Sequence, residues 1–267
     1  MCSVIKLWLL TGGALLFAAN PALRVCADPN NLPFSDRQEQ GFENRLATLM
    51  ASDLGMSVEY TWFPQRGSFF RKTVGAGQCD VVMGVPAGMK AGVIATEPYY
   101  RSTYVFVTRQ DRNLGLHSLN DARLRKLSIG VQVLGDSDRS SPPAQALIER
   151  GIVRNLVAFN IFGNLNEADP AADLIHAVEN GQVDVAVAWG PMAGYFAKSA
   201  KVPLEVTAID YDSSQAVPLV FDIAIGVGKA DLKLRDQLNG ELGRRKAEID
   251  ILLKNYGIPR TSDPGER

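Results

Sequence analysis

The sequence predicts an α/β fold of two lobes, each a mostly parallel sheet flanked by helices, joined by two extended crossovers. Short apolar strands alternate with amphipathic helices along most of the chain, which is typical of parallel sheets with helical connections. Two separate stretches match later stretches at one fixed offset, which indicates two lobes of similar build. Residues 97–111 and 220–227 are rich in β-branched and aromatic side chains, and we expect them to form the crossovers.

The first lobe is expected to start with the strand "LRVCAD" from Leu23 and to continue with a helix over 42–54. The apolar residues of that helix recur near helical spacing, and Gly55 provides its C-terminal stop. The strand "VEYTWF", a short helix at "FFRKTV" and the strand "DVVMGV" follow in this order.

The second lobe repeats the alternation. The strand "LSIGVQV" leads to a helix opened by Pro142-Pro143, and then to the strand "LVAFNIF". Asp169 and Pro170 provide an N-cap and a first-turn proline for the next helix. That helix leads to the strand "VDVAVAW", which ends in the large aromatic Trp189.

The internal match has a constant offset. "VGAGQCDVVMGVP" and "VENGQVDVAVAWG" share Gly77 with Gly181 and Asp80 with Asp184, and each pair is 104 residues apart. "LRVCAD" falls on "LSIGVQ" at the same offset. A chance resemblance of Val-rich strands is the alternative to a true structural repeat.

Two crossovers imply that the first lobe is discontinuous. We expect a signal segment over 1–22, a first lobe over 23–106 with 221–267, and a second lobe over 107–220. A final helix over 231–255 is expected to pack back on the first lobe.

The N-terminus resembles a secretory signal. One basic residue, Lys6, precedes an apolar run over 7–19 that is too short to cross a membrane as a helix. Cleavage is expected near Ala22, with Ala18 and Ala19 as alternative sites, and a retained membrane anchor as the alternative to cleavage. No later segment approaches membrane length, so no membrane span is expected after cleavage.

Cysteine usage fits an exported chain. Cys2 leaves with the signal, and the remaining pair, Cys26 and Cys79, predicts one disulfide, with two buried free thiols as the alternative. The chain has only 2 histidines, which supply no metal-site spacing, and His176 fits an ordinary helix surface.

Charge and motifs exclude several functions. The chain carries 28 Lys and Arg against 29 Asp and Glu, without a basic block, so no nucleic-acid footprint is present. The sequence has no Gly-x-Ser-x-Gly elbow and no phosphate-binding loop, so we expect a protein that is not an enzyme.

Two such lobes with paired crossovers, together with "CDVVMGVP", "PYYRSTYVFVTR" and "VDVAVAWGPMAGYFA", resemble a type 2 periplasmic solute-binding protein. More narrowly, "LRVCADPNNLPFS", "GFENRLA", "VEYTWFPQR", "RGIV", "FDIAIGV" and "AEID" are similar to the MxaJ/XoxJ group. The resemblance implies a periplasmic protein that works with a quinoprotein methanol dehydrogenase dependent on pyrroloquinoline quinone (PQQ), and also suggests the dehydrogenase's c-type cytochrome as a partner.

The resemblance also makes Trp189 unusual. Relatives that bind amino acids usually present a carboxylate at this strand end and an arginine in the loop matching "PAGMKAGVIATEP", which here contains none. The loop "LGDSDRSSPP" adds Asp136 and Asp138, which would repel an anion, unless it is a solvated turn outside the cleft. Trp189 therefore argues against amino-acid capture.

Instead, the ends of the predicted strands place aromatic and neutral side chains at a shared cleft. Arg66 and Arg101 could hold an anionic cofactor such as PQQ, but we predict no bound cofactor and no metal. The two hypotheses are an accessory factor that binds the dehydrogenase and, as the alternative, an importer's receptor for a small ligand that is not an amino acid. The candidate cleft residues are Asp28, Asn30, Phe34, Trp62, Gln65, Arg66, Pro86, Tyr99, Tyr100, Arg101, Trp189 and Tyr195.

Overall fold

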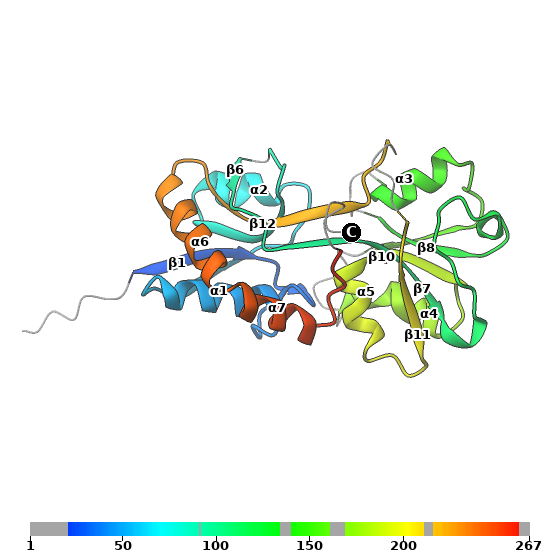
Figure 1. Cartoon of the computed structure of the whole chain (residues 1–267). Helices are drawn as coiled ribbons and strands as arrows, with labels where there is room; N and C mark the ends of the chain where they lie inside the picture. Colours follow the sequence, from blue (N-terminus) through cyan, green and yellow to red (C-terminus); the bar gives the residue numbers. More distant parts are fainter. Residues whose placement is uncertain (1–20, 91, 134–139, 161–168, 211–215, 262–267) are drawn as a thin grey trace, which may run out of the picture.

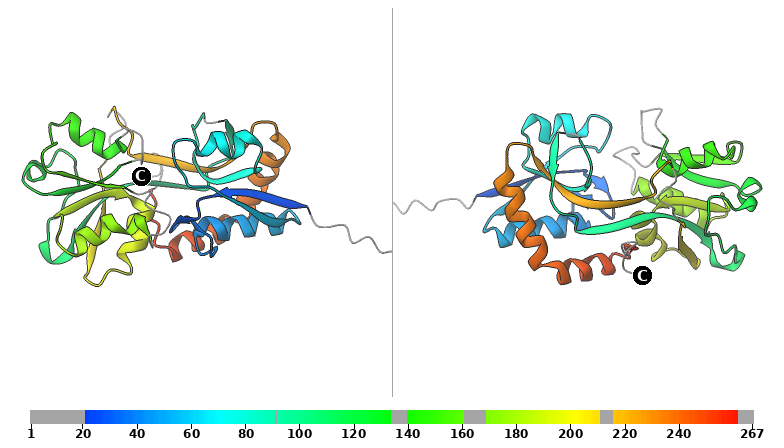
Figure 2. Two further views of the ribbon diagram at one scale, coloured as in Figure 1. Left: turned by 180° about the vertical axis from the view of Figure 1, so that it is seen from behind. Right: turned by 45° about the horizontal axis from the view of Figure 1, so that its top comes forward.

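The structure is a computed structural model that describes residues 21–90, 92–133, 140–160, 169–210 and 216–261. It confirms the two-lobed α/β prediction: two layered lobes lie side by side and two long strands run from one to the other (Figure 1). The views from behind and from above show the same elongated arrangement (Figure 2). The predicted signal segment and the loop with Asp136 and Asp138 lie outside the described residues.

The first lobe is built on the strand order β4-β1-β5-β12, in which β1, β4 and β5 are parallel. Helix α1 and the two C-terminal helices cover one face of this sheet, and α2 lies on the other face (Figure 1). Its elements are β1 (Ala22–Ala27), β2 (Asn30–Asn31), β3 (Ser35–Asp36), α1 (Phe42–Asp53), β4 (Ser57–Trp62), α2 (Phe69–Lys72), η1 (Val74–Ala76), β5 (Val81–Pro86), β6 (Val93–Ala95), α6 (Leu232–Arg244) and α7 (Lys246–Asn255).

The second lobe has the order β7-β10-β8-β9, with β8, β9 and β10 parallel. Helix α3 covers one face and helices α4 and α5 the other. Its elements are η2 (Gln110–Arg112), η3 (Ala122–Arg125), β8 (Ile129–Val133), α3 (Pro142–Glu149), β9 (Leu156–Asn160), η4 (Pro170–Ala172), α4 (Asp173–Glu179), β10 (Val185–Trp189), α5 (Gly190–Ala197) and β11 (Leu204–Ala208).

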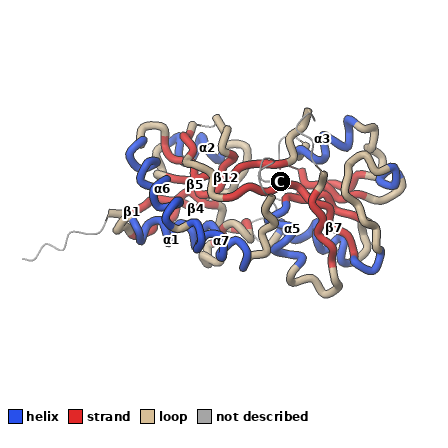
Figure 3. Tube along the Cα trace, viewed as in Figure 1, coloured by secondary structure: helices blue, strands red, loops and turns tan. Residues whose placement is uncertain are grey.

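The crossovers are β7 (Tyr100–Arg109) and β12 (Val220–Gly228), whose strands run between the lobes in Figure 3. They pair with each other antiparallel where the lobes meet, from Tyr100 opposite Ile223 to Thr103 opposite Val220. The element order fits the expected discontinuous first lobe, while the lobe boundaries themselves stay predictions.

The predicted internal repeat has a geometric counterpart. Val25 of β1 pairs with Val81 of β5, and in the second lobe Ile129 of β8 pairs with Val185 of β10, so both members shift by the same 104 positions. These matched pairs occupy equivalent places in two parallel sheets. The sequence match therefore reflects two lobes of similar build.

In each lobe the matched aspartate joins two neighbouring strands through a hydrogen bond to a backbone N–H. Asp80 accepts the backbone N–H of Arg24 at 3.0 Å, and Asp184 accepts that of Ser128 at 2.8 Å. Gly77, three residues before Asp80, has φ +67°, and Gly181, three residues before Asp184, has φ +72°. The shared motif thus closes a turn and joins two strands in each lobe.

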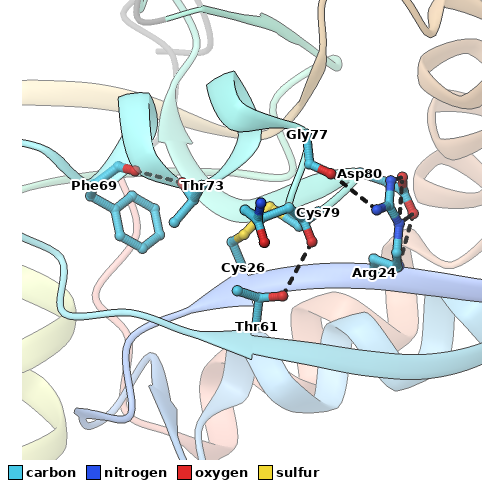
Figure 4. The surroundings of a disulfide bond; sticks show 9 residues. Arg24, Cys26, Thr61, Phe69, Thr73, Gly77, Cys79 and Asp80 are labelled. Atoms are coloured by element: carbon cyan, nitrogen blue, oxygen red, sulfur yellow. Dashed lines mark hydrogen bonds and ion pairs between the residues drawn. A yellow bond between two sulfur atoms is a disulfide. The ribbon is translucent and has the colours of Figure 1, made fainter.

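Cys26 and Cys79 form a disulfide with Cα atoms 5.6 Å apart (Figure 4). Both residues are buried, together with Phe69 and Val74, beneath the short helices on the outer face of the first lobe. The bond links β1 to the turn that leads into β5 and confirms the predicted pairing in the structure.

Two local expectations were wrong, and several strands were not predicted. The final helix is two helices, α6 and α7, because Arg245 leaves helical geometry between them and its guanidinium pairs with Asp53 at 2.6 Å. Asp169 does not cap its helix, since it adopts φ +46° and its side chain makes no capping hydrogen bond. Strands β6 and β11, which were not predicted, each pair antiparallel with a crossover, β6 with β12 and β11 with β7.

The C-terminal segment also reaches beyond the first lobe. α7 packs on α1 through Ile249 and Leu253, as expected. Beyond α7, the Ser102 hydroxyl donates to the Pro259 carbonyl oxygen at 2.6 Å and Tyr256 stacks on Tyr195 of α5 at 5.9 Å. The chain end therefore ties both lobes at the crossovers.

Across the described part of the chain, no helix is long and apolar enough to cross a membrane. The same residues contain no cluster of His, Cys, Asp and Glu that could hold a metal ion.

Candidate functional site

A cavity of about 930 Å³ lies where the lobes and both crossovers meet. This volume is within the range of small-molecule sites. Its wall is largely aromatic and apolar, with few polar groups. The aromatic residues that line it are Phe34, Phe63, Phe69, Phe70, Tyr100, Tyr104, Trp189 and Phe221.

Trp189 stands at the end of β10, as predicted, and its indole forms part of this wall. It lies opposite Tyr104 of β7 in the sheet register, with ring centroids 5.2 Å apart. Phe221 of β12 completes an edge-to-face group at 5.9 Å from Trp189. The backbone N–H of Trp189 donates to the Gln132 side-chain oxygen at 3.1 Å, which fixes the strand end. The indole is therefore held by both crossovers and by the second lobe.

An acidic residue, Glu43, lines the cavity from the first turn of α1. Its carboxyl group lies against Gly84 of β5, where a Cβ atom would stand only 2.0 Å from Oε1. Burial among apolar neighbours raises the pKa of Glu43 to about 8. A carboxyl group in this place is costly to ionise unless a cation accompanies it.

The second lobe contributes two buried polar side chains to the cavity. Gln132 is only 4% exposed, and its amide nitrogen donates to the Met192 sulfur at 2.9 Å. Ser141, at the start of α3, is 1% exposed, and its hydroxyl has no hydrogen-bond partner among the described residues. The next two residues are prolines, so the start of α3 offers fewer backbone N–H donors than an ordinary helix.

Two cations stand at the edge of the cavity. Arg66 and Lys72 are exposed residues of the segment between β4 and η1, and the Lys72 ammonium lies 5.6 Å from the centroid of the Phe63 ring. The segment over 86–98 has no arginine, as noted from the sequence, but these two residues show that cationic groups reach the cleft from another loop.

Residues 23–257 match the model of the bacterial extracellular solute-binding proteins, family 3. The chain is 31% identical to Protein MoxJ of Paracoccus denitrificans over 93% of its own length and 94% of the relative's. The structure of the periplasmic binding protein XoxJ from Methylobacterium extorquens AM1 is similar with a TM-score of 0.74, at 35% identity, covering 90% of this chain and all of that one. MxaJ from Methlophaga aminisulfidivorans MPT gives a TM-score of 0.75 at 28% identity, covering 90% of this chain and 100% of that one.

The chain belongs to the family 3 solute-binding proteins, in the MxaJ/XoxJ group. The family resemblance inferred from the sequence is thereby confirmed, together with the two-lobed fold that it implied.

Six of the residues proposed from the sequence meet at the cavity of this family member. They come from the loop after β2, the segment after β4, the end of β5, the first crossover and the end of β10. These residues are Phe34, Gln65, Arg66, Pro86, Tyr100 and Trp189.

Two further proposed residues, Asp28 and Asn30, lie next to the cavity wall without lining it. Asp28 accepts the backbone N–H groups of Gln65 at 2.6 Å and Asn30 at 2.9 Å, so it holds the β4 loop in place. Burial raises the pKa of Asp28, and these two hydrogen bonds oppose that rise. Asn30 itself belongs to the short β2, and neither residue lines the cavity.

The other four proposed residues face elsewhere. Trp62 stacks on Tyr60 at 4.5 Å, and the Tyr99 hydroxyl donates to the Met83 carbonyl oxygen at 3.0 Å. Arg101 pairs with Asp222 at 3.3 Å, so the cavity does not bring Arg66 and Arg101 together for an anionic cofactor. Tyr195 lines a separate cavity of about 350 Å³ beside the exposed His176.

Several lining residues were not proposed from the sequence. Tyr104 could have been proposed, because it belongs to the predicted crossover, and in the structure it lies directly opposite Trp189. Glu43 carried no signal, since an acidic residue in a first helical turn is ordinary. Gln132 and Ser141 flank the segment over 134–139, which had been considered only for its charges.

Proposed function

We propose that the protein is a periplasmic accessory factor of a methanol-oxidising system and binds a PQQ-dependent methanol dehydrogenase to assist its maturation or activation. Membership of the MxaJ/XoxJ group supports the setting. The observation that carries the mode of action is the aromatic wall around Trp189, because Trp and Tyr are enriched at the centres of protein interfaces. The role is one of binding rather than of catalysis.

The cleft would contact the dehydrogenase through a side chain or short segment that enters between the lobes. Trp189, Tyr104 and Phe221 hold one another edge to face, so the wall would bind a partner with little loss of side-chain freedom. The dehydrogenase's c-type cytochrome is a further candidate partner.

A capture experiment tests the proposal. The tagged mature chain is incubated with periplasmic extract of methanol-grown cells of the source bacterium, and bound proteins are identified by mass spectrometry. We expect a quinoprotein dehydrogenase, captured less well by Trp189→Ala than by Trp62→Ala, because Trp62 lies outside the cavity. Failure to capture the dehydrogenase, in both its cofactor-free and its loaded form, contradicts the proposal.

A second candidate function is the receptor of an importer for a small ligand that is not an amino acid. The cavity volume of about 930 Å³ favours it, since a drug-sized molecule would fit. Extraction of the denatured protein decides between the two. A stoichiometric small molecule that co-purifies with the wild type and not with Trp189→Ala would favour the receptor.

A further inference from the structure

We infer that the cleft recognises a single alkylammonium group, which pairs with the Glu43 carboxylate while its alkyl chain lies against the aromatic wall. Two sources offer this chemistry: a free small amine, or a lysine side chain of a protein partner. The recognition itself does not depend on the partner's identity, whereas the lysine source rests on the function proposed above.

The first observation is an acid without a partner. Glu43 forms no hydrogen bond and no ion pair through its carboxyl group within the described part of the chain, although it lines the cavity. The absence of a side chain at Gly84 gives the carboxyl group its place. Glu43 is half-buried, and a carboxylate in such a place is costly to ionise without a partner, so a cation from outside the chain would supply what the protein does not.

The second observation is the aromatic surround. Tyr99 and Tyr100 lie close enough to Glu43 for its charge to raise the pKa of both phenols, after burial as the larger cause. Tyr100 lines the cavity together with the Trp189 group. Aromatic faces attract organic cations, and an alkyl chain gains further from apolar contact with side chains such as Met89.

The third observation is Ser141, on the second lobe. Its hydroxyl is 1% exposed, lines the same cavity and has no partner among the described residues. A hydroxyl oxygen can accept an N–H, so the lobe opposite Glu43 offers a polar group that has no partner among the described residues and could receive an ammonium N–H.

The other charged groups limit the ligand to one positive charge. Arg66 and Lys72 are the remaining charged residues among the described part of the lining, and both are exposed at its edge. They would repel a second cation on the ligand. Among the described lining residues Glu43 is the only carboxylate, whereas hard cations require several oxygen ligands, so these residues fit an organic cation better than a metal ion.

Binding of n-butylammonium, which is the lysine side chain without its backbone, tests the inference. The titration follows Trp189 fluorescence in a Trp62→Phe background, with 1-butanol as the neutral probe of similar shape. We expect saturable binding of the amine, and binding at least about tenfold weaker for 1-butanol and for Glu43→Gln. Glu59→Gln, at an exposed acid on β4, is the matched control and should bind as the wild type does.

A second measurement remains valid if Glu43→Gln fails to fold. Because burial keeps Glu43 protonated below about pH 8, amine binding at pH 7 should release about one proton. Calorimetry of the wild type in two buffers of different ionisation enthalpy measures this release. An amine that does not bind, or that binds without a proton and as well as 1-butanol, overturns the inference.

Competition then identifies the source. Displacement of the captured dehydrogenase by excess n-butylammonium indicates a lysine of the partner. Amine binding that leaves the dehydrogenase complex intact indicates a free amine. A dehydrogenase complex formed by a protein that ignores the amine leaves the proposed function standing and rejects only the alkylammonium inference.

Discussion

Removal of the disulfide should destabilise the protein without changing its fold. The perturbation is the double substitution Cys26→Ala and Cys79→Ala, which leaves no polar group in the buried site that the bond occupies. The neighbouring pairing of Val25 with Val81 does not need the bond. The second lobe makes the equivalent strand pair with Gly130 and Val183 at the matched positions, in contact without a disulfide.

The size of the effect follows from the loop that the bond closes. A sequence separation of 53 residues corresponds, in the chain-entropy account, to about 4 kcal/mol of stabilisation through the unfolded state. Loss of the buried sulfur atoms adds a smaller packing cost. We therefore expect the free energy of unfolding of the first lobe to fall by about 4 kcal/mol.

Urea unfolding, followed by circular dichroism and tryptophan fluorescence, measures the difference between wild type and the double variant. Thiol titration of the denatured, unreduced wild type should find neither cysteine free. Wild type unfolded in the presence of a reductant is the matched control and should resemble the double variant. A loss below about 1 kcal/mol, or two free thiols per mature chain, would refute the reasoning.

Three further outcomes are expected. Because the pKa of Glu43 is raised to about 8 in the folded protein, its contribution to stability is complete at acidic pH and is lost as the pH rises. Urea unfolding should show the wild type losing up to about 4 kcal/mol relative to Glu43→Gln between about pH 4.5 and 8. The N-terminus of helix α1 favours the ionised carboxyl group and opposes part of this loss. Gly84→Ala should lower the melting temperature only slightly, at a cost of roughly 1 kcal/mol or less, because its Cβ would displace only the flexible end of the Glu43 side chain. Amino acids without a side-chain cation should give no saturable thermal shift at millimolar concentration, since the segment over 86–98 has no arginine and Pro142 and Pro143 remove N–H donors. The assay is sensitive enough, because a ligand with a micromolar Kd would stabilise the protein by about 4 kcal/mol and raise its melting temperature by several degrees.

The sequence was informative wherever a local pattern decides the structure. Strand and helix periodicity located most elements, and Gly55 follows a helix end with positive φ as expected. The matched Asp80 and Asp184 indicated the repeat because each directly precedes its strand, β5 or β10, and bonds a backbone N–H 56 residues earlier in the chain.

The sequence was less informative about which side chains share the cavity. Trp189 could be placed from its strand end, but Tyr195, a few residues later, is turned away by α5 onto Tyr256. Asp28 follows β1, yet its carboxylate accepts hydrogen bonds from the backbone N–H groups of Asn30 and Gln65 and does not line the cavity. Such choices depend on tertiary contacts that no local spacing encodes.

Glu43 could not be recognised from the sequence at all. In a first helical turn an acidic residue is favoured by the helix dipole, and nothing nearby marks it as buried. Its place depends on Gly84, which lies on a strand 41 positions later, and it lies near Tyr99 and Tyr100 at the start of the first crossover. The least compensated charge in the cleft was therefore visible only in three dimensions.

If Trp189 anchors a methanol dehydrogenase in the cleft, calorimetric titration of the purified dehydrogenase will show it. The cofactor-free and the loaded enzyme are each titrated with wild type, Trp189→Ala and, as the control outside the cavity, Trp62→Ala. Wild type and Trp62→Ala should bind alike, and Trp189→Ala should bind more weakly by about 2 kcal/mol or more, roughly 30-fold, while remaining folded. Equal affinity of all three proteins, or a Trp189→Ala variant whose only defect is a lower melting temperature, would contradict the account.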